Sequence, residues 1–242
     1  MKKILSFCLI SLVILSLPAF VQSQTTEEVV KKMIKAQGGR DVLSKIKDST
    51  FTGTMELVQM GISGSATMYQ KEPNMMRMDA EVMGMMYTQA FDGETAWMIN
   101  PQTGSTEEMP EKAAEYMKRE AMGNDALLNP QKYGITFSYK GKEKIEEKEH
   151  LVLEQTFADG YKVTMYLDPE TYLIFKTKAI TLNQMGVEVE AETFLSDYKE
   201  VEGVMIPHTI TTFQDGEEFM RITLTEVSFN SGLEDSLFKM SE

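Results

Sequence analysis

The sequence is almost without cysteine, since Cys8 is the only one among 242 residues. Cys8 lies early in an apolar run over residues 4–17, whereas a lipid-modified cysteine would follow such a run and a small residue. We therefore expect no lipid anchor at this position. A single cysteine also excludes an internal disulfide framework, and loss of Cys8 would leave no thiol nucleophile and no thiolate metal site.

A membrane-spanning segment is lacking as well. The run over residues 4–17 is shorter than the about 20 apolar residues that a membrane-spanning helix needs. Two lysines precede it, and the Val-Gln-Ser stretch that ends at Ser23 is typical of a cleavage site. These features predict a signal peptide over residues 1–23, removed after about Ser23, rather than a retained anchor. The exported protein would then be free in the periplasm of a Gram-negative cell.

Histidine is scarce, since only His150 and His208 are present. Neither has the spacing of a catalytic triad or a metal site, and we expect both to be solvated polar residues. The sequence also lacks a phosphate-binding loop, a dinucleotide-binding glycine motif and a zinc-binding His-Glu helix. We therefore expect a protein that is not an enzyme and that has no cofactor and no bound metal.

Positive charge is in deficit. The chain has 24 basic and 37 acidic side chains, a net charge of −13, and loss of the two lysines of the signal leaves 22 basic residues and a net charge of −15. Such a surface repels the phosphate backbone, so we expect no nucleic-acid partner.

Methionine, in contrast, is abundant. The chain has 20, and ten of them lie between Met55 and Met98. Methionine is flexible and polarizable, and it fills irregular apolar spaces or adapts to varied partners. The density of methionine in this region requires an explanation beyond average composition.

The hydrophobic pattern begins with helix signals and then changes to a period of two. Hydroxyl and acidic residues at 25–28 precede an apolar stripe that Gly38 and Gly39 end, and a shorter helical turn is predicted over residues 41–47. A second helix is predicted over residues 111–122, inserted among strands. Strands are predicted over residues 49–57, at Ala66 and Met68, and over residues 75–82, and a hairpin over residues 86–100 turns at Asp92 and Gly93. Further strands are predicted at residues 135–139, 144–157, 161–167, 172–181, 187–199, 207–214 and 218–229.

This pattern predicts a mainly β (α+β) fold with about eleven antiparallel strands and no domain boundary over residues 24–242. An antiparallel meander of that length curls, so we expect a strongly curved sheet, an unclosed barrel, with the N-terminal and inserted helices covering its concave face.

Three interpretations of the methionines remain open. They fill an ordinary core, they bind copper(I) through thioethers, or they line a hydrophobic cavity for an apolar ligand. The residues predicted to line such a cavity are Phe51, Met55, Leu57, Met68, Met76, Met78, Phe91, Trp97, Met117, Tyr166 and Phe175.

Several segments, in this order, resemble the outer-membrane lipoprotein-sorting protein family, the LolA-like carriers. They are residues 36–39 (AQGG), 43–47 (LSKIK), 51–55 (FTGTM), 91–97 (FDGETAW), 166–171 (YLDPET) and 197–207 (DYKEVEGVMIP). The resemblance covers nearly the whole of residues 24–242.

The resemblance implies an unclosed β-barrel whose mouth helices plug, and a cavity for lipid or for lipoprotein acyl chains. It implies a carrier in lipoprotein sorting or lipid transport, with inner- and outer-membrane lipoprotein machinery as partners. A sensor or scaffold that regulates a membrane partner is the alternative, since related folds serve as stress sensors. Arg40, Arg77 and Arg119 are candidates for the arginine that locks the lid in the best-known carrier.

Overall fold

The computed structural model describes residues 24–100, 102–183 and 185–240, so the predicted signal peptide lies outside the described residues. The first helix, α1 (Thr26–Ala36), starts as the sequence predicts. The Thr25 hydroxyl accepts a hydrogen bond from the Glu28 amide, and the Glu28 carboxylate accepts one from the Thr25 amide. A one-turn helix, α2 (Arg40–Leu43), follows, shorter than the predicted turn over residues 41–47.

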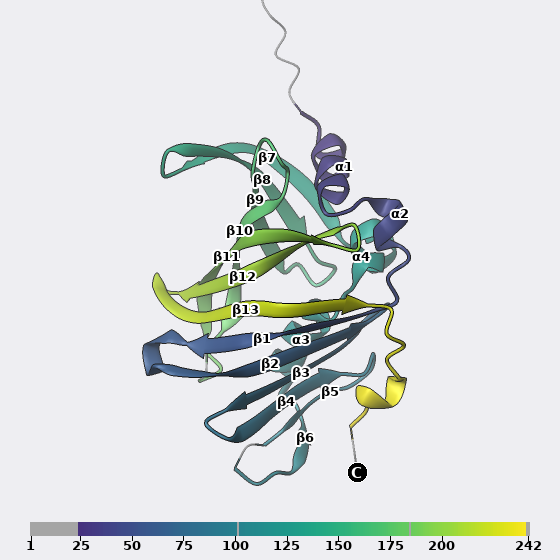
Figure 1. The fold of residues 1–242 in the computed structure, drawn as a ribbon. Helices are drawn as coiled ribbons and strands as arrows, with labels where there is room; N and C mark the ends of the chain where they lie inside the picture. Colours follow the sequence, from purple (N-terminus) through teal and green to yellow (C-terminus); the bar gives the residue numbers. More distant parts are fainter. Residues whose placement is uncertain (1–23, 101, 184, 241–242) are drawn as a thin grey trace, which may run out of the picture.

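Thirteen antiparallel strands form one sheet, in the order β6-β5-β4-β3-β2-β1-β13-β12-β11-β10-β9-β8-β7 (Figure 1). Every neighbouring pair is consecutive in the chain except β1 and β13, which join two meanders at the centre of the sheet. The strands are β1 (Asp48–Leu57), β2 (Ile62–Lys71), β3 (Met75–Val82), β4 (Met85–Phe91), β5 (Ala96–Ile99), β6 (Thr106–Glu108), β7 (Thr136–Ile145), β8 (Lys148–Thr156), β9 (Lys162–Leu167), β10 (Ile174–Leu182), β11 (Glu188–Val201), β12 (Val204–Gln214) and β13 (Glu217–Phe229).

The two meanders end at opposite edges of the sheet, at β6 and at β7, so the sheet does not close into a barrel. The chain crosses from one edge to the other through α3 (Glu111–Glu120), α4 (Asn124–Leu128) and the 3-10 helix η2 (Pro130–Tyr133). Two shorter 3-10 helices, η1 (Val58–Met60) and η3 (Asp235–Leu237), lie after β1 and near the C-terminus. The predicted unclosed, strongly curved antiparallel sheet with an inserted helix is therefore confirmed.

Glycine allows the strands to approach closely at the centre of the sheet. A Cβ atom on Gly53 would collide with the backbone carbonyl of Thr223 on β13, and one on Gly64 would collide with that of Glu81 on β3. The β1–β13 register also shifts between Thr52 and Gly53. Bulges and glycines are the usual means of bending a sheet sharply, and they bend this one where its two meanders meet.

Three details of the predicted elements are wrong. The described residues form thirteen strands where about eleven are predicted, in part because β6 contains only three residues and has no clear period. The turn expected at residues 140–143 lies instead at Glu146 and Glu147, because Gly141 occupies a bulge within β7. A further short helix, α4, begins at Asn124, directly after the predicted helix over residues 111–122 and where no helix is predicted.

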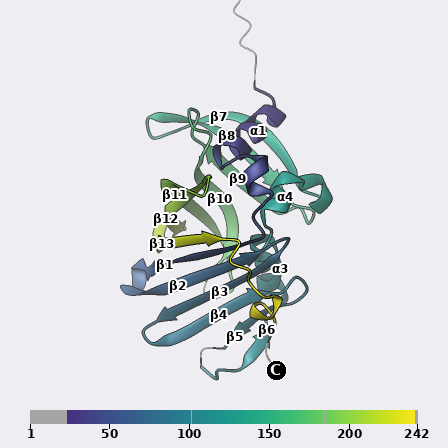
Figure 2. The same cartoon turned by 45° about the vertical axis from the view of Figure 1, so that its right-hand side comes forward.

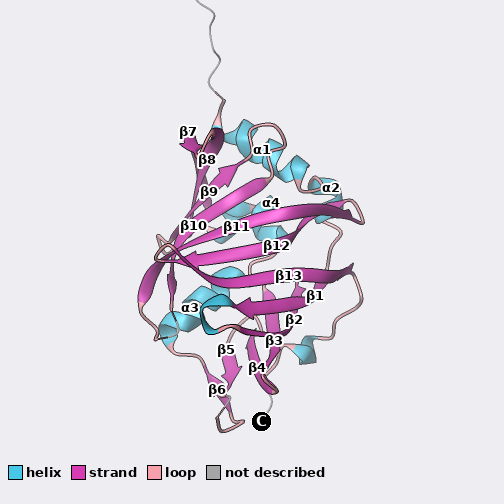
Figure 3. Ribbon diagram, turned by 60° about the vertical axis from the view of Figure 1, so that its left-hand side comes forward, coloured by secondary structure: helices cyan, strands magenta, loops and turns pink. Residues whose placement is uncertain are grey.

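Both helices predicted to cover the sheet contact the same face. Val29 and Met33 of α1 pack on Leu151, Leu153, Met165 and Leu167, whereas Met117 and Ala121 of α3 pack on Met76, Phe91 and Ala96. When the paired residues are followed from β8 across the sheet to β4, both sets of helix-contacting residues fall on the same side of the sheet. We call this the inner face, and Figure 3 shows the helices gathered against the bent sheet.

Candidate functional site

Eight of the eleven predicted cavity residues lie on the inner face. Phe51 pairs with Met68 and Met68 with Met78, so the three side chains form a row across β1, β2 and β3. The remaining inner-face residues of the predicted set are Met55, Leu57, Met76, Phe91 and Met117, the last of which projects from α3.

The central part of the inner face has its own cluster of apolar side chains, which contains no described residue of α1 or α3. Here Met55, Ala66, Ala80 and Val82 are buried under larger side chains, and the described residues of this cluster all belong to strands. The other members of this cluster, Ile62, Tyr87, Met220 and Ile222, are half-buried. We call these half-buried and buried inner-face residues of β1, β2, β3 and β13 the central strip: Phe51, Met55, Leu57, Met68, Met78, Met220 and Ile222.

Strands β11 to β13 add apolar residues to the inner face that are not among the eleven predicted cavity residues. Leu195 pairs with Ile210, Ile210 with Ile222, and Ile222 with Met55, which extends the inner apolar surface across the central β1–β13 pair. The sequence of residues 218–229 does show the alternation of a strand. The alternation alone does not tell which of the two sets of side chains faces inward, and the pairing of β13 with β1 determines this.

Trp97 lies on the opposite, outer face. Its indole N–H donates a hydrogen bond of 2.8 Å to the Phe238 carbonyl, and the Arg77 guanidinium lies over its ring. Arg77 also donates to the Leu237 carbonyl, so the C-terminal segment with η3 covers this part of the sheet (Figure 2). Trp97 is therefore buried by the end of the chain and does not join the inner-face residues.

Tyr166 and Phe175 also lie on the outer face. Phe175 occupies a bulge between Ile174 and Lys176 and stacks on His150, with ring centroids 4.6 Å apart. Lys176 is buried between the rings of Tyr166 and Phe194 and pairs with Glu192 at 2.7 Å. His150 is thus 3% exposed and His208 is 8% exposed, which corrects the expectation that both are solvated.

Polar contacts fasten α3 across the inner side of the sheet. Lys112, near its start, pairs with Glu188 at 2.8 Å, and Arg119, near its end, pairs with Asp159 of the β8–β9 turn. The Arg119 guanidinium lies 4.7 Å from the ring centroid of Tyr116 and 4.2 Å from that of Tyr161. Burial raises the pKa of Tyr161 to about 12. These contacts connect α3 to strands far from β4 and β5, on which it packs.

A cleft lies between α1, α2 and the α4–η2 segment. This cleft has a volume of about 510 Å³, and Val30, Ile34, Leu127 and Leu128 provide its apolar lining. Arg40 also lines the cleft; its guanidinium donates hydrogen bonds to the Leu128 carbonyl at 2.5 Å and to Oδ1 of Asn129 at 3.5 Å.

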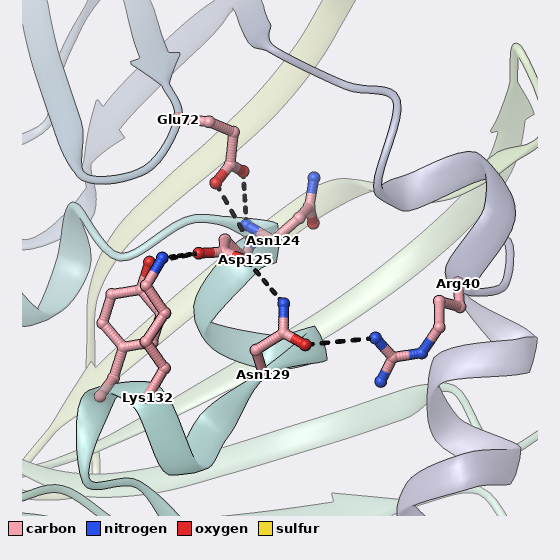
Figure 4. A network of polar contacts seen from close by, with 7 residues as sticks. Arg40, Glu72, Asn124, Asp125, Asn129 and Lys132 are labelled. Carbon is pink, nitrogen blue, oxygen red and sulfur yellow. Dashed lines mark hydrogen bonds and ion pairs between the residues drawn. The ribbon is translucent and has the colours of Figure 1, made fainter.

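A polar network holds the α4 side of this cleft (Figure 4). Asp125 accepts hydrogen bonds from Lys132 at 2.7 Å, Tyr133 at 2.5 Å and Asn129 at 2.6 Å, and these bonds hold the pKa of its carboxyl well below the usual range. Glu72, from the β2–β3 turn, accepts the backbone N–H groups of Asn124 and Asp125. A distant turn thus caps α4 and fixes the position of the cleft wall.

Solved structures share this architecture. A DUF1329 family protein from Desulfovibrio piger matches with a TM-score of 0.59 and 14% identity, over 90% of this chain and 98% of that one. A LolA superfamily protein from Nitrosomonas europaea matches with a TM-score of 0.58 and 12% identity, over 90% and 98% of the two chains. The fold is LolA-like. A putative outer membrane lipoprotein-sorting protein domain from Vibrio parahaemolyticus matches with a TM-score of 0.56 and 17% identity, over 87% and 94%.

Neither a protein-family model nor a curated protein sequence matches the chain, so the likeness at these identities concerns the fold alone. In the part of the chain that the structure describes, no helix is both long and apolar enough to cross a membrane.

Within the LolA-like fold, the three arginines singled out from the sequence have different surroundings. Arg77 lies on the outer face beside Trp97, Arg119 fastens α3, and Arg40 connects α2 to the end of α4. Only Arg40 of these three lines the cleft between the helices.

Proposed function

We propose that the protein is a periplasmic carrier, with one binding domain over residues 24–242, that holds the acyl chains of a lipid or lipoprotein against the methionine-rich central strip. The observation that supports this proposal is the central strip itself, an inner apolar surface of which, among the described residues, only Met68 packs in the α3 cluster. Its side chains are half-buried, except that of Met55, which is buried. Apolar side chains that stay partly accessible on one face of a sheet are suited to bind an apolar ligand.

The chemistry of the strip suits a flexible chain. Burying one methylene is worth about 0.8 kcal/mol, so about ten methylenes provide about 8 kcal/mol before the costs of ordering the chain are subtracted. Methionine side chains repack around such a ligand at little cost, because their three rotatable bonds allow many shapes. The apolar strip and the LolA-like fold together support a role in outer-membrane lipoprotein sorting or lipid transport. In that role, lipoprotein machinery would be the donor and the acceptor of the ligand.

Native mass spectrometry of the full chain, exported by a Gram-negative cell and purified from its periplasm, tests the proposal. We expect the removal of residues 1–23 and co-purifying lipid. A bare protein mass, together with no uptake of a fluorescent fatty acid, would contradict a carrier. A stable protein partner recovered without lipid would favour the sensor or scaffold instead.

A matched pair of substitutions locates the binding surface. Met78→Gln places an amide on the central strip, whereas Met185→Gln makes the same change at a position that is 83% exposed. We expect Met78→Gln to weaken fatty-acid binding about fivefold, because the amide has no partner under a bound chain. Met185→Gln should bind like the unmodified protein. Equal effects of the two changes would place the ligand elsewhere.

A further inference from the structure

The cleft between α1, α2 and the α4–η2 segment has a cation at its edge. Its volume of about 510 Å³ lies within the range of small-ligand sites, and its lining is largely apolar. A site of this composition suits a molecule with an apolar body and one polar end. The nature of that polar end follows from the charges around the cleft.

Arg40 differs from the other arginines of the chain. Arg77 pairs with Asp79, Arg119 with Asp159 and Arg221 with Glu218, but Arg40 forms no ion pair with any carboxylate among the described residues. The chain has 37 acidic side chains against 24 basic ones, so a lack of acids does not explain this. A guanidinium has five N–H donors, and the hydrogen bonds to Leu128 and Asn129 use only two of them.

The surroundings of Arg40 are basic, although the chain as a whole is acidic. Residues 24–47 contain six basic and three acidic side chains, a local net charge of +3 in a chain of net charge −13. Lys31 and Lys35 follow Val30 and Ile34 on α1, about 100° further round the helix, on the flank away from the buried Val29 and Met33. An anion approaching this end of the molecule is therefore attracted rather than repelled.

The wall of the cleft is already ordered. Lys132 is neutralised by Asp125, which also holds the Asn129 amide and so directs its oxygen toward Arg40 (Figure 4). A group that is held in place before binding loses little entropy when the ligand arrives. Arg40 can thus present its unused donors to an anion without a rearrangement of α4.

The apolar lining leads to the inner face. Ile34, Leu127 and Leu128 pack in one cluster with Phe229, and Phe229 contacts Phe51 edge-to-face with ring centroids 6.4 Å apart. Phe51 belongs to the central strip and pairs with Met68. Apolar side chains are therefore in contact from the cleft to the central strip, and this is the direction in which we place the alkyl chain.

From these contacts we propose that the cleft is the headgroup site for an anionic amphiphile, in which Arg40 binds a phosphate or carboxylate and the alkyl chain extends toward the central strip. This inference rests on the proposed function, since it assigns the end of the ligand whose chain the central strip holds.

Three surfactants with the same twelve-carbon chain test the proposal. Dodecyl phosphate is anionic, dodecyl phosphocholine is zwitterionic and dodecyl maltoside is uncharged, and each is titrated below its critical micelle concentration. We expect dodecyl phosphate to bind at least tenfold more tightly than dodecyl maltoside, with the preference reduced by added salt. Inorganic phosphate should compete only at far higher concentration, because it gains nothing from the apolar lining.

Substitutions assign the preference to Arg40. Arg40→Gln should lower the affinity for dodecyl phosphate about tenfold and leave that for dodecyl maltoside unchanged, whereas Arg221→Gln, at an exposed ion pair, should change neither. Arg40→Lys keeps the charge and should retain part of the preference. Equal binding of all three surfactants would overturn the headgroup site alone, and binding of none would overturn the carrier as well.

A reporter at the cleft keeps the test valid if Arg40→Gln does not fold. With Cys8 replaced by serine the chain has no cysteine, so a fluorophore can be attached through Gln131→Cys at the cleft or through Gln59→Cys near η1. Dodecyl phosphate should change the emission of the first label at lower concentration than that of the second. A response at Gln59 alone would contradict the site.

Discussion

Two regions of the inner face have the same period of two but different coverage. On β8 and β9, Leu151, Leu153 and Leu167 are at most 1% exposed because α1 lies on them. On β1 to β3, Met68 and Met78 also face inward and are half-buried, although Met68 packs against the cluster of Met117 and Ala121 of α3. The comparison teaches that leucine and methionine together fill the part of the face that α1 closes, whereas the half-buried apolar positions on β2 and β3 are methionines at residues 68 and 78.

Truncation of one side chain in each region tests this contrast most directly. Leu153→Ala should destabilise the protein by about 3 kcal/mol, because it leaves a cavity beneath α1 that the packed neighbours cannot fill. Met78→Ala should cost about 1 kcal/mol, since the side chain is only half-buried. Urea denaturation followed by circular dichroism measures both. Equal losses would mean that the central strip is ordinary packed core.

The curvature between the two regions gives a second, smaller effect. Gly64→Ala places a methyl group against the Glu81 carbonyl, so the strands must separate where the sheet bends. We expect a loss of about 2 kcal/mol in unfolding free energy, together with weaker fatty-acid binding because the central strip flattens. Ser65→Ala, at the next and exposed residue of β2, is the control, since it changes the same strand without adding a contact. Unchanged stability in Gly64→Ala would show that the bend does not depend on this contact.

Much of this contrast could be predicted from the sequence. The alternation of Phe51, Met55, Met76 and Met78 assigned one face to each strand, and the inserted helix followed from its own apolar stripe. These features are local, and each depends on residues a few positions apart. Their placement on the inner face needed only that the strands pair in sequence order, which all but β1 and β13 do.

The errors have long-range causes. Trp97 lies in a strand that is apolar on both faces, and its partner Phe238 is 141 residues away. Phe175 faces outward because a bulge shifts the register beside it. The Arg40 cleft depends on α4, and the N-terminus of α4 is capped by Glu72 of the β2–β3 turn, 52 residues earlier in the sequence. No window of a single sequence contains such contacts.

Alkaline pH tests how firmly α3 joins the two regions, and here we expect the smallest effect. The pKa of Tyr161 in the folded protein is about 12, above the ordinary value of about 10, because burial disfavours the phenolate. Its hydroxyl donates a hydrogen bond of 2.6 Å to the Ile180 carbonyl. The folded state therefore keeps this proton, and the contribution to stability is complete below pH 10 and lost as the pH rises toward 12.

At pH 11 the loss should be about 1 kcal/mol in the unmodified protein and smaller in Tyr161→Phe, as measured by urea denaturation at pH 8 and pH 11. Tyr172→Phe is the control, since hydrogen bonds to that hydroxyl lower its pKa despite burial. If Tyr161→Phe and Tyr172→Phe lost stability equally, the contact of α3 with the β8–β9 turn would not be the alkali-sensitive point, and the two regions of the inner face would be joined mainly by the sheet.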